Sequence, residues 1–236
     1  MSAGSQRGGV GRGLLIFLVV LVAVLVALDR VGDAVAERFA ADTIQSNQHL
    51  AKRPDVNITG FPFLTQLAAG NFDKIIVTAD DVSIGSGSTD LQLSTIQITL
   101  HHVHVARDLS SVHADTADAV ATMTYAELGR TLGDARIRYD GGGRITAAKS
   151  IDIFGQRVSG AISARPQLEN DTLSFGEVRI NGVNQLIAQA GGLLAKVFDI
   201  RLPLSGIPFD VRVRSLNADQ AGLHLTLVGR NLSYSR

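Results

Sequence analysis

The chain has 236 residues, of which 45% are hydrophobic, and its 22 basic side chains balance 22 acidic ones, a composition and length that allow one sizeable domain or two small ones. It contains no cysteine, which excludes disulfides, cysteine-ligated zinc, thiol catalysis and lipidation of an N-terminal cysteine. The balanced charge excludes the basic surface that nucleic-acid-binding proteins need, so nucleic acid is not expected as a partner.

The N-terminus carries a membrane-directed pattern. A segment rich in Gly and Ser contains Arg7 and Arg12, and the unbroken apolar run Leu14 to Leu28 follows it. Positive charge before an apolar run predicts that the N-terminus stays inside and that everything after the run is outside. A helix of this length spans roughly 22 Å, short of the ~30 Å hydrocarbon core, so it lies between a signal peptide and a transmembrane span.

We favour a retained anchor over a cleaved signal peptide. The nearest small-x-small cleavage site, Ala34-Val35-Ala36, lies beyond three charged residues. A buried soluble helix is disfavoured because the run has no polar face. The sequence therefore predicts a membrane anchor or signal segment over residues 1–30. It predicts one domain over residues 31–236, on the extracytoplasmic face of the plasma membrane or in the cell envelope.

The first half of this domain reads as a helix followed by long strands. Residues 31–50 are predicted to form an amphipathic helix, in which Val31, Val35 and Phe39 repeat every four residues, and Pro54 ends it. Strands are predicted over residues 55–59, 71–84, 91–105 and 112–123, with a turn at residues 85–88. Thr124 and Glu127 form a capping box that opens a short helix ending near Leu132.

The second half continues with strands around one further helix. Strands are predicted around residues 137–139, 151–153, 158–164, 173–180, 211–214 and 223–227, separated by turns at 141–143, 155–156 and 170–171. Residues Val183 to Phe198 are predicted to form a long helix, apolar on most sides and interrupted by Gly191-Gly192.

These elements predict an α+β fold in which a long, highly curved antiparallel sheet wraps around the long apolar helix. Strands of this length exceed the usual five or six residues and must curl to cover their apolar face. Such a sheet could enclose an elongated apolar ligand. A tightly filled sandwich core accounts for the same residues and is favoured by the pattern alone.

The sequence carries little chemistry. It lacks a phosphate-binding loop, a nucleophile elbow and a zinc-binding HExxH helix, so neither enzymatic activity nor a cofactor is predicted. His102 and His104 share a strand face at roughly 7 Å, close enough to chelate one metal ion. No third ligand is predicted on that face, so solvated positions are favoured and no metal site is predicted. Asp115 and Asp118, three residues apart, are predicted to lie on opposite faces.

Two apolar segments are candidates for ligand contact. Phe61, Phe63, Leu64 and Leu67 concentrate apolar area between Gly60 and Gly70. Pro203 and Pro208 each follow an aliphatic residue, and proline removes a donor from a strand, which favours a sheet edge or a bend. Core filling and the lip of a lipid pocket both explain these residues.

Four segments together resemble a known family. Residues 60–67 (GFPFLTQL), 124–128 (TYAEL), 202–209 (LPLSGIPF) and 221–229 (AGLHLTLVG) are similar, in matching order, to the LmeA-like family of phospholipid-binding proteins. The resemblance runs from about residue 31 to residue 236. It implies a TULIP-like fold on the outer side of the plasma membrane in an actinobacterial envelope. It also implies binding of phosphatidylinositol-type phospholipids and support of mannan elongation on lipomannan.

The leading hypothesis is a non-enzymatic phospholipid-binding protein whose partners are a phospholipid and the plasma membrane, with envelope glycosyltransferases as further candidate partners. The alternative is a membrane-anchored interaction module for envelope glycosyltransferases that has no lipid cavity. A hydrolase acting on envelope glycolipids is disfavoured. The predicted lipid contacts are apolar residues of both candidate segments and of the long helix: Phe61, Phe63, Leu64, Leu67, Leu186, Ile187, Leu193, Leu194, Val197, Phe198, Pro203 and Pro208.

Overall fold

The structure is a computed structural model, and it describes residues 9–84, 91–153, 156–169, 172–181, 198–199, 201–204 and 211–235. The described residues form three helices and eleven strands. The helices are α1 (Gly9–Gln48), α2 (Phe63–Ala69) and α3 (Tyr125–Thr131). The strands are β1 (Asp55–Thr59), β2 (Asn71–Ile84), β3 (Leu91–Val105), β4 (Ser111–Met123), β5 (Arg136–Gly141), β6 (Arg144–Ile153), β7 (Gln156–Glu169), β8 (Thr172–Asn181), β9 (Leu202–Pro203), β10 (Arg212–Ala218) and β11 (Leu223–Ser235).

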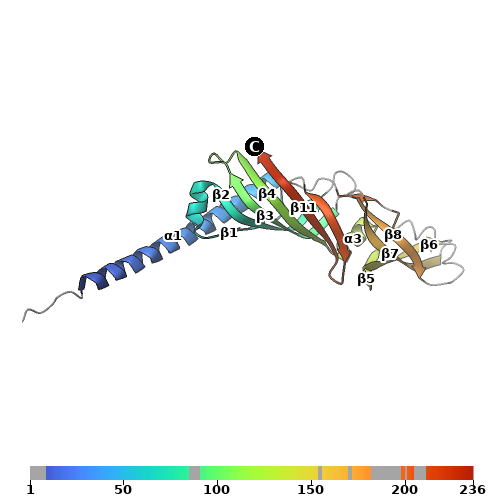
Figure 1. Cartoon of the computed structure of the whole chain (residues 1–236). Coiled ribbons are helices and arrows are strands. Elements are labelled where there is room, and N and C mark those ends of the chain that lie inside the picture. The colour runs from blue at the N-terminus through green and yellow to red at the C-terminus, as the bar shows by residue number, and fades with distance from the viewer. Residues whose placement is uncertain are drawn as a thin grey trace, which may run out of the picture.

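The strands divide between two antiparallel sheets. The larger sheet has the order β1-β2-β3-β4-β11-β10, and the smaller one has the order β5-β6-β7-β8-β9. Figure 1 shows the two sheets side by side, with α3 at their junction. The predicted α+β class and long antiparallel strands are confirmed, but the described strands form two sheets rather than one. The chain leaves the larger sheet through α3 after β4, and β5 to β9 then pair only with one another until β10 returns to β11.

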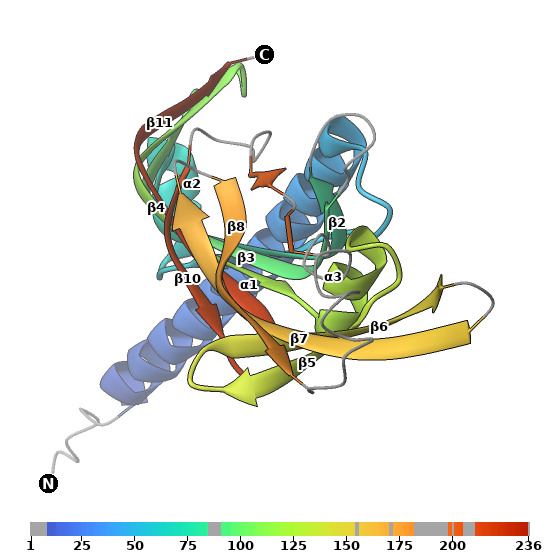
Figure 2. The ribbon, with the colours of Figure 1, turned by 90° about the vertical axis from the view of Figure 1, so that its right-hand side faces the viewer.

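The larger sheet bends along a line that crosses three of its strands. The register places His102 of β3 and Asn231 of β11 on either side of Asp115 in β4. His102 and Asn231 have positive φ angles of 51°, and both Asp115 and its neighbour Thr116 point outward. One extra outward residue bends a strand and increases its twist. Because neighbouring strands carry the extra residue at the same level, the register is kept while the sheet curves, as Figure 2 shows for β4 and β11.

The inner face of the larger sheet is apolar throughout its length. Two buried clusters lie on this face. The first joins α1 and α2 to β1 and to the end of β2 that includes Phe72. The second joins the other half of the larger sheet to α3 and the smaller sheet. Leu100 and Val211 pack against both clusters, so the two are continuous. The outer face of β4 carries mainly polar side chains, such as Thr116 and Asp118, and is open to solvent. The sheet is therefore amphipathic, with most of its apolar side chains on one side.

Helix α1 is longer than the sequence pattern predicted. It runs without a break from the apolar run into the domain, and it projects beyond the sheets at its N-terminal end (Figure 1). Every residue from Ile16 to Leu28 is exposed. The apolar repeat of Val31, Val35 and Phe39 is not the packed face of this helix, because all three residues are at least 60% exposed. Among the described residues, no helix is both long enough and apolar enough to cross a membrane.

The predicted capping box at the start of α3 is confirmed. The Thr124 side chain accepts a hydrogen bond from the Glu127 amide, and the Glu127 carboxylate accepts one from the Thr124 amide at 2.7 Å. The next residue, Tyr125, donates its hydroxyl proton to the carbonyl oxygen of Asp219, and the carbonyl oxygen of Gly222 lies 3.2 Å away. Burial, followed by the nearby negative charge of Asp219, raises the pKa of Tyr125 to about 12. Helix α3 thus fixes the turn between β10 and β11.

Replacing Tyr125 tests this attachment. Tyr125→Phe removes the hydroxyl that donates to the carbonyl oxygen of Asp219, so we expect the free energy of unfolding to fall by about 1 kcal/mol. Tyr234→Phe is the matched control because its ring is exposed at the end of β11. Chemical denaturation of both variants measures the difference, and equal effects would contradict the assignment.

Candidate functional site

Three acidic residues of α1 lie on one face of the helix, and two of them hold neighbouring elements. Asp29, Asp33 and Glu37 recur every four residues and therefore share one face of the helix. Asp29 Oδ1 accepts a hydrogen bond from the Leu64 amide at 2.8 Å, and Glu37 Oε1 accepts one from the Ile58 amide at 2.9 Å. Hydrogen bonds to a charged acceptor are worth about 1.5–3 kcal/mol. These carboxylates therefore fix α2 and β1 on the helix.

Asp33 lies between these two attachments without a backbone partner. It is 9% exposed, its Oδ1 atom is buried without a hydrogen-bond partner, and Oδ2 lies 3.6 Å from Arg30 Nη1. Burial is the main cause that raises the pKa of Asp33, and the charge of Asp29 adds to it, while Arg30 opposes the rise. Burying the Asp33 carboxylate therefore lowers the stability of the folded protein.

Helix α2 separates its apolar residues between the interior and the surface. Phe63 is buried and packs against Phe72 of β2, with ring centroids 6.2 Å apart. Phe61, Leu64 and Leu67 are exposed, and the Arg30 guanidinium lies 5.4 Å from the centroid of the Phe61 ring. All four predicted contacts of this segment thus lie on or beside one short helix at the end of the larger sheet. Their role in lipid binding stays a prediction.

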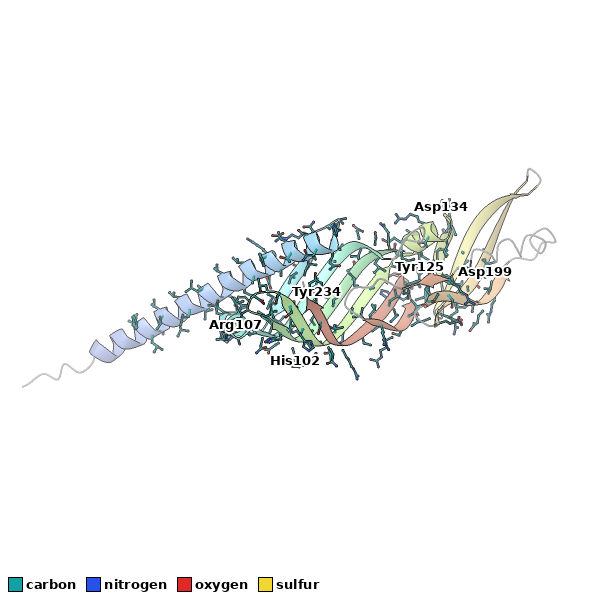
Figure 3. The ribbon with its side chains drawn as sticks, turned by 90° about the horizontal axis from the view of Figure 1, so that it is seen from above. His102, Arg107, Tyr125, Asp134, Asp199 and Tyr234 are labelled. Carbon is teal, nitrogen blue, oxygen red and sulfur yellow. The ribbon has the colours of Figure 1, made fainter. Side chains whose placement is uncertain are left out.

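The end of α2 is held against the sheet by its backbone. Gly70 follows the helix in the left-handed conformation, with φ 68°, and its carbonyl oxygen accepts a hydrogen bond from the Val105 amide at 2.8 Å. A Cβ atom at Gly70 would lie 2.6 Å from the carbonyl oxygen of Val105, so only glycine fits there. Helix α2 therefore lies beside the end of β3, as Figures 1 and 3 show. Figure 3 labels Arg107, which follows this end of β3.

The central strand of the inner face carries very small side chains. The buried residues of β4 are Ala114, Ala117, Ala119 and Ala121, followed by Met123; we call the four alanines the alanine row. The neighbouring strands carry larger residues on the same face, including Ile98 of β3 and Leu225 of β11. The apolar pattern of the sequence does not reveal this row, because alanine adds little to a hydrophobic pattern. The alternation from residue 117 to 121 is the signal that could have found it.

The other predicted contacts lie away from α2. Phe198 is buried against Phe175 of β8, with ring centroids 5.0 Å apart, and belongs to the cluster that includes the smaller sheet. Pro203 lies in β9, an edge strand, as predicted. Leu186, Ile187, Leu193, Leu194, Val197 and Pro208 lie outside the described residues, as do residues 183–197 of the predicted long helix. The structure therefore places Phe198 and Phe63 in different halves of one apolar interior.

The histidines of β3 and β4 lie on the outer face of the larger sheet. His101 is 3.5 Å from Asp118, while His102 and His113 approach opposite oxygens of Asp115 at 3.6 and 3.7 Å. The prediction that Asp115 and Asp118 face opposite sides is wrong, because the extra residue at the bend turns both outward. In the part of the chain that the structure describes, no group of three or more candidate ligands could hold a metal ion.

What the described residues bring together is apolar: a buried interior inside the bent sheet and exposed apolar side chains around α2. The family model for LmeA-like phospholipid-binding proteins matches residues 27–228, and the chain belongs to that family. The resemblance drawn from the four sequence segments is confirmed. Membership indicates phospholipid binding and favours a non-enzymatic role. No curated protein and no solved structure shows significant similarity to the chain.

Neutralising Asp33 tests the cost of burying its charge. Because folding raises the pKa of Asp33, the protonated form favours the folded state, so stability is lost as the pH rises through the folded value. We expect Asp33→Asn to stabilise the protein at pH 7 by up to about 1 kcal/mol. The gain should vanish below pH 3.8, the ordinary value for an aspartate.

Thermal unfolding from pH 3 to pH 8 measures this difference. Asp42→Asn is the control, because Asp42 lies on the same helix but is exposed, and it pairs with Arg53 at 3.1 Å. A loss of stability for Asp33→Asn at pH 7 would show that its carboxylate is needed in the charged form.

Proposed function

We propose that the protein is a non-enzymatic phospholipid carrier or sensor that works at the extracytoplasmic face of the plasma membrane. Family membership supports phospholipid binding. The observation that carries the proposal is the continuous apolar inner face of the larger sheet, with the alanine row along its central strand. Acyl chains would pack over these small side chains, and each methylene that is removed from water contributes roughly 0.8 kcal/mol.

The exposed apolar run of α1 supports the membrane part of the proposal. Residues Ile16 to Leu28 expose apolar side chains on all sides of the helix, and no other described element packs over them. An apolar surface of this size in water is unfavourable, and a bilayer would cover it. We therefore propose that the run inserts into the plasma membrane, retained as an anchor, and that the TULIP-like domain stands beside the bilayer.

The proposal also covers the headgroup of the bound lipid and the biosynthetic pathway that the protein serves. The motif resemblance suggests a phosphatidylinositol-type phospholipid and support of mannan elongation on lipomannan. A carrier or sensor of the lipid on which the mannan is built would serve that process without catalysing it.

Native mass spectrometry tests whether the protein holds a lipid. We expect the full chain, purified from its membrane without detergent exchange, to carry about one phospholipid per protein molecule and to exchange it with added phosphatidylinositol. A protein that is free of phospholipid and does not take it up from vesicles would overturn the proposal.

A substitution in the alanine row tests where the acyl chains lie. Ala119→Leu adds three carbon atoms to the inner face, and displacing three methylenes of a bound lipid would cost about 2.4 kcal/mol, roughly fiftyfold in affinity. Val120→Leu is the matched control because Val120 is the next residue of β4 and is exposed on the outer face. Lipid bound per protein and the unfolding midpoint should be measured together.

The same two variants distinguish the lipid carrier from a second candidate function. The alanine row is buried within the two apolar clusters, and this burial favours the alternative of a filled interior in an interaction module for envelope glycosyltransferases. In that case Ala119→Leu would overpack the core and lower stability by about 1–3 kcal/mol, with no lipid to lose. Loss of lipid with a smaller change in stability would favour the carrier.

A further inference from the structure

Exposed apolar residues surround α1 just after its apolar run. Val31 and Val35 project from the helix itself, and Phe61, Leu64 and Leu67 project from α2 and the residues before it. These five residues, which we call the apolar collar, are between 41% and 63% exposed. Scattered exposed apolar residues are ordinary on a protein surface, but a concentration at one level along a helix is not.

The collar is fixed at the level where the apolar run ends. Leu28 is the last residue of the run, and the side chain of the next residue, Asp29, binds the Leu64 amide at 2.8 Å. The Arg30 guanidinium lies over the Phe61 ring, and a Cβ atom at Gly32 would lie 3.2 Å from Leu64 Cδ2. Helix α2 therefore contacts α1 within the first helical turn beyond the run.

The two parts of the collar lie on different sides of α1. Successive helical residues are rotated by about 100°, so Val31 and Val35 lie within about 40° of each other, and Asp29 and Asp33 lie on roughly the opposite side. Helix α2 is attached on the side of Asp29. Apolar side chains thus face outward both from the free side of α1 and from the side that carries α2.

The charges at this level are arranged for an anionic lipid surface. Asp29 and Asp33 are turned inward and are 3% and 9% exposed. The Arg30 side chain, by contrast, is 57% exposed. At the boundary of the run, the helix therefore shows a cation to its surroundings and hides both carboxylates. Arginine pairs well with lipid phosphate groups.

We infer that the apolar collar is a docking surface that lies in the headgroup region of a lipid bilayer and holds the α2 end of the domain against it. A flat lipid surface crossed by a helix touches all sides of that helix at one level, whereas a protein partner or a second copy of the chain would cover one side. The inference rests on the proposed insertion of the apolar run. It adds that α2 meets the lipid directly, with Phe63 facing the interior on the same short helix.

Single tryptophans test this placement, because the chain has none of its own. Leu64→Trp and Val35→Trp report the two sides of the collar, Phe17→Trp reports the apolar run, and Val120→Trp on the outer face of β4 is the control. The full-length variants are placed in vesicles of phosphatidylcholine and phosphatidylglycerol that contain phospholipid brominated on the acyl chains. We expect blue-shifted emission and quenching by the brominated lipid for the first three, and quenching by aqueous iodide for Val120→Trp.

Each outcome decides a separate question. If Phe17→Trp is quenched by the lipid while Leu64→Trp and Val35→Trp behave like Val120→Trp, the run inserts and the collar inference is wrong. If only one of the two collar tryptophans is shielded from aqueous iodide, the collar inference is again wrong, and a protein partner or second copy covers that side. If Phe17→Trp is also exposed to iodide, the proposed insertion fails first, and the collar inference fails with it.

A transfer assay separates docking from lipid binding. Val31→Asp and Val35→Asp place charges on the free side of α1, which carries none of the predicted lipid contacts. We expect both variants to keep their bound phospholipid in native mass spectrometry but to slow the transfer of a fluorescent phospholipid between vesicles at least tenfold. Val120→Asp is the control. Transfer at the wild-type rate would overturn the collar inference while leaving phospholipid binding intact.

Discussion

The hydrogen bonds that the carboxylates of α1 accept from the backbone of α2 and β1 determine how the rest of the structure is oriented. Helix α1 has no break between its apolar run and the part that packs on the sheet. Asp29 binds the Leu64 amide just after the apolar run, and Glu37 binds the Ile58 amide further along the helix. Because the helix is continuous and bound at two points, the direction of the apolar run relative to the larger sheet is fixed. A surface that covers the apolar run therefore always lies at the end of the domain that carries α2.

The bend of the larger sheet follows from a second local constraint. Three neighbouring strands each take one extra outward residue at the level of Asp115, and two of these strands use positive φ angles to do so, at His102 and Asn231. Since the shift occurs at the same level in each strand, the apolar residues on both sides of the bend stay on the inner face. The sheet thereby curves without breaking its apolar interior into two.

Much of the fold could be predicted because its strands alternate clearly and its turns use the expected residues. The predicted bounds of β1, β2 and β3 are those observed, and Pro203 lies at the predicted sheet edge. The inner face of α1 could not be predicted, because Asp29 and Glu37 face inward to accept hydrogen bonds from the backbone of later segments. Hydrophobic periodicity carries no signal for such contacts. The faces of Asp115 and Asp118 were wrong for a related reason: period-two alternation assumes a strand without an extra residue.

Helix α2 connects the two apolar environments of the protein. Its Phe63 packs within the interior cluster, while Leu64, the next residue, is exposed beside α1 at the level where the apolar run ends. The outer face of β4 is largely polar, so a phospholipid moving between a bilayer and the inner face would find little apolar surface along that side. A path along α2 keeps acyl chains near apolar side chains throughout, which lowers the cost of leaving the bilayer. The carboxylate of Asp29 that fixes α2 thus joins the surface proposed to meet the membrane to the surface proposed to hold the lipid.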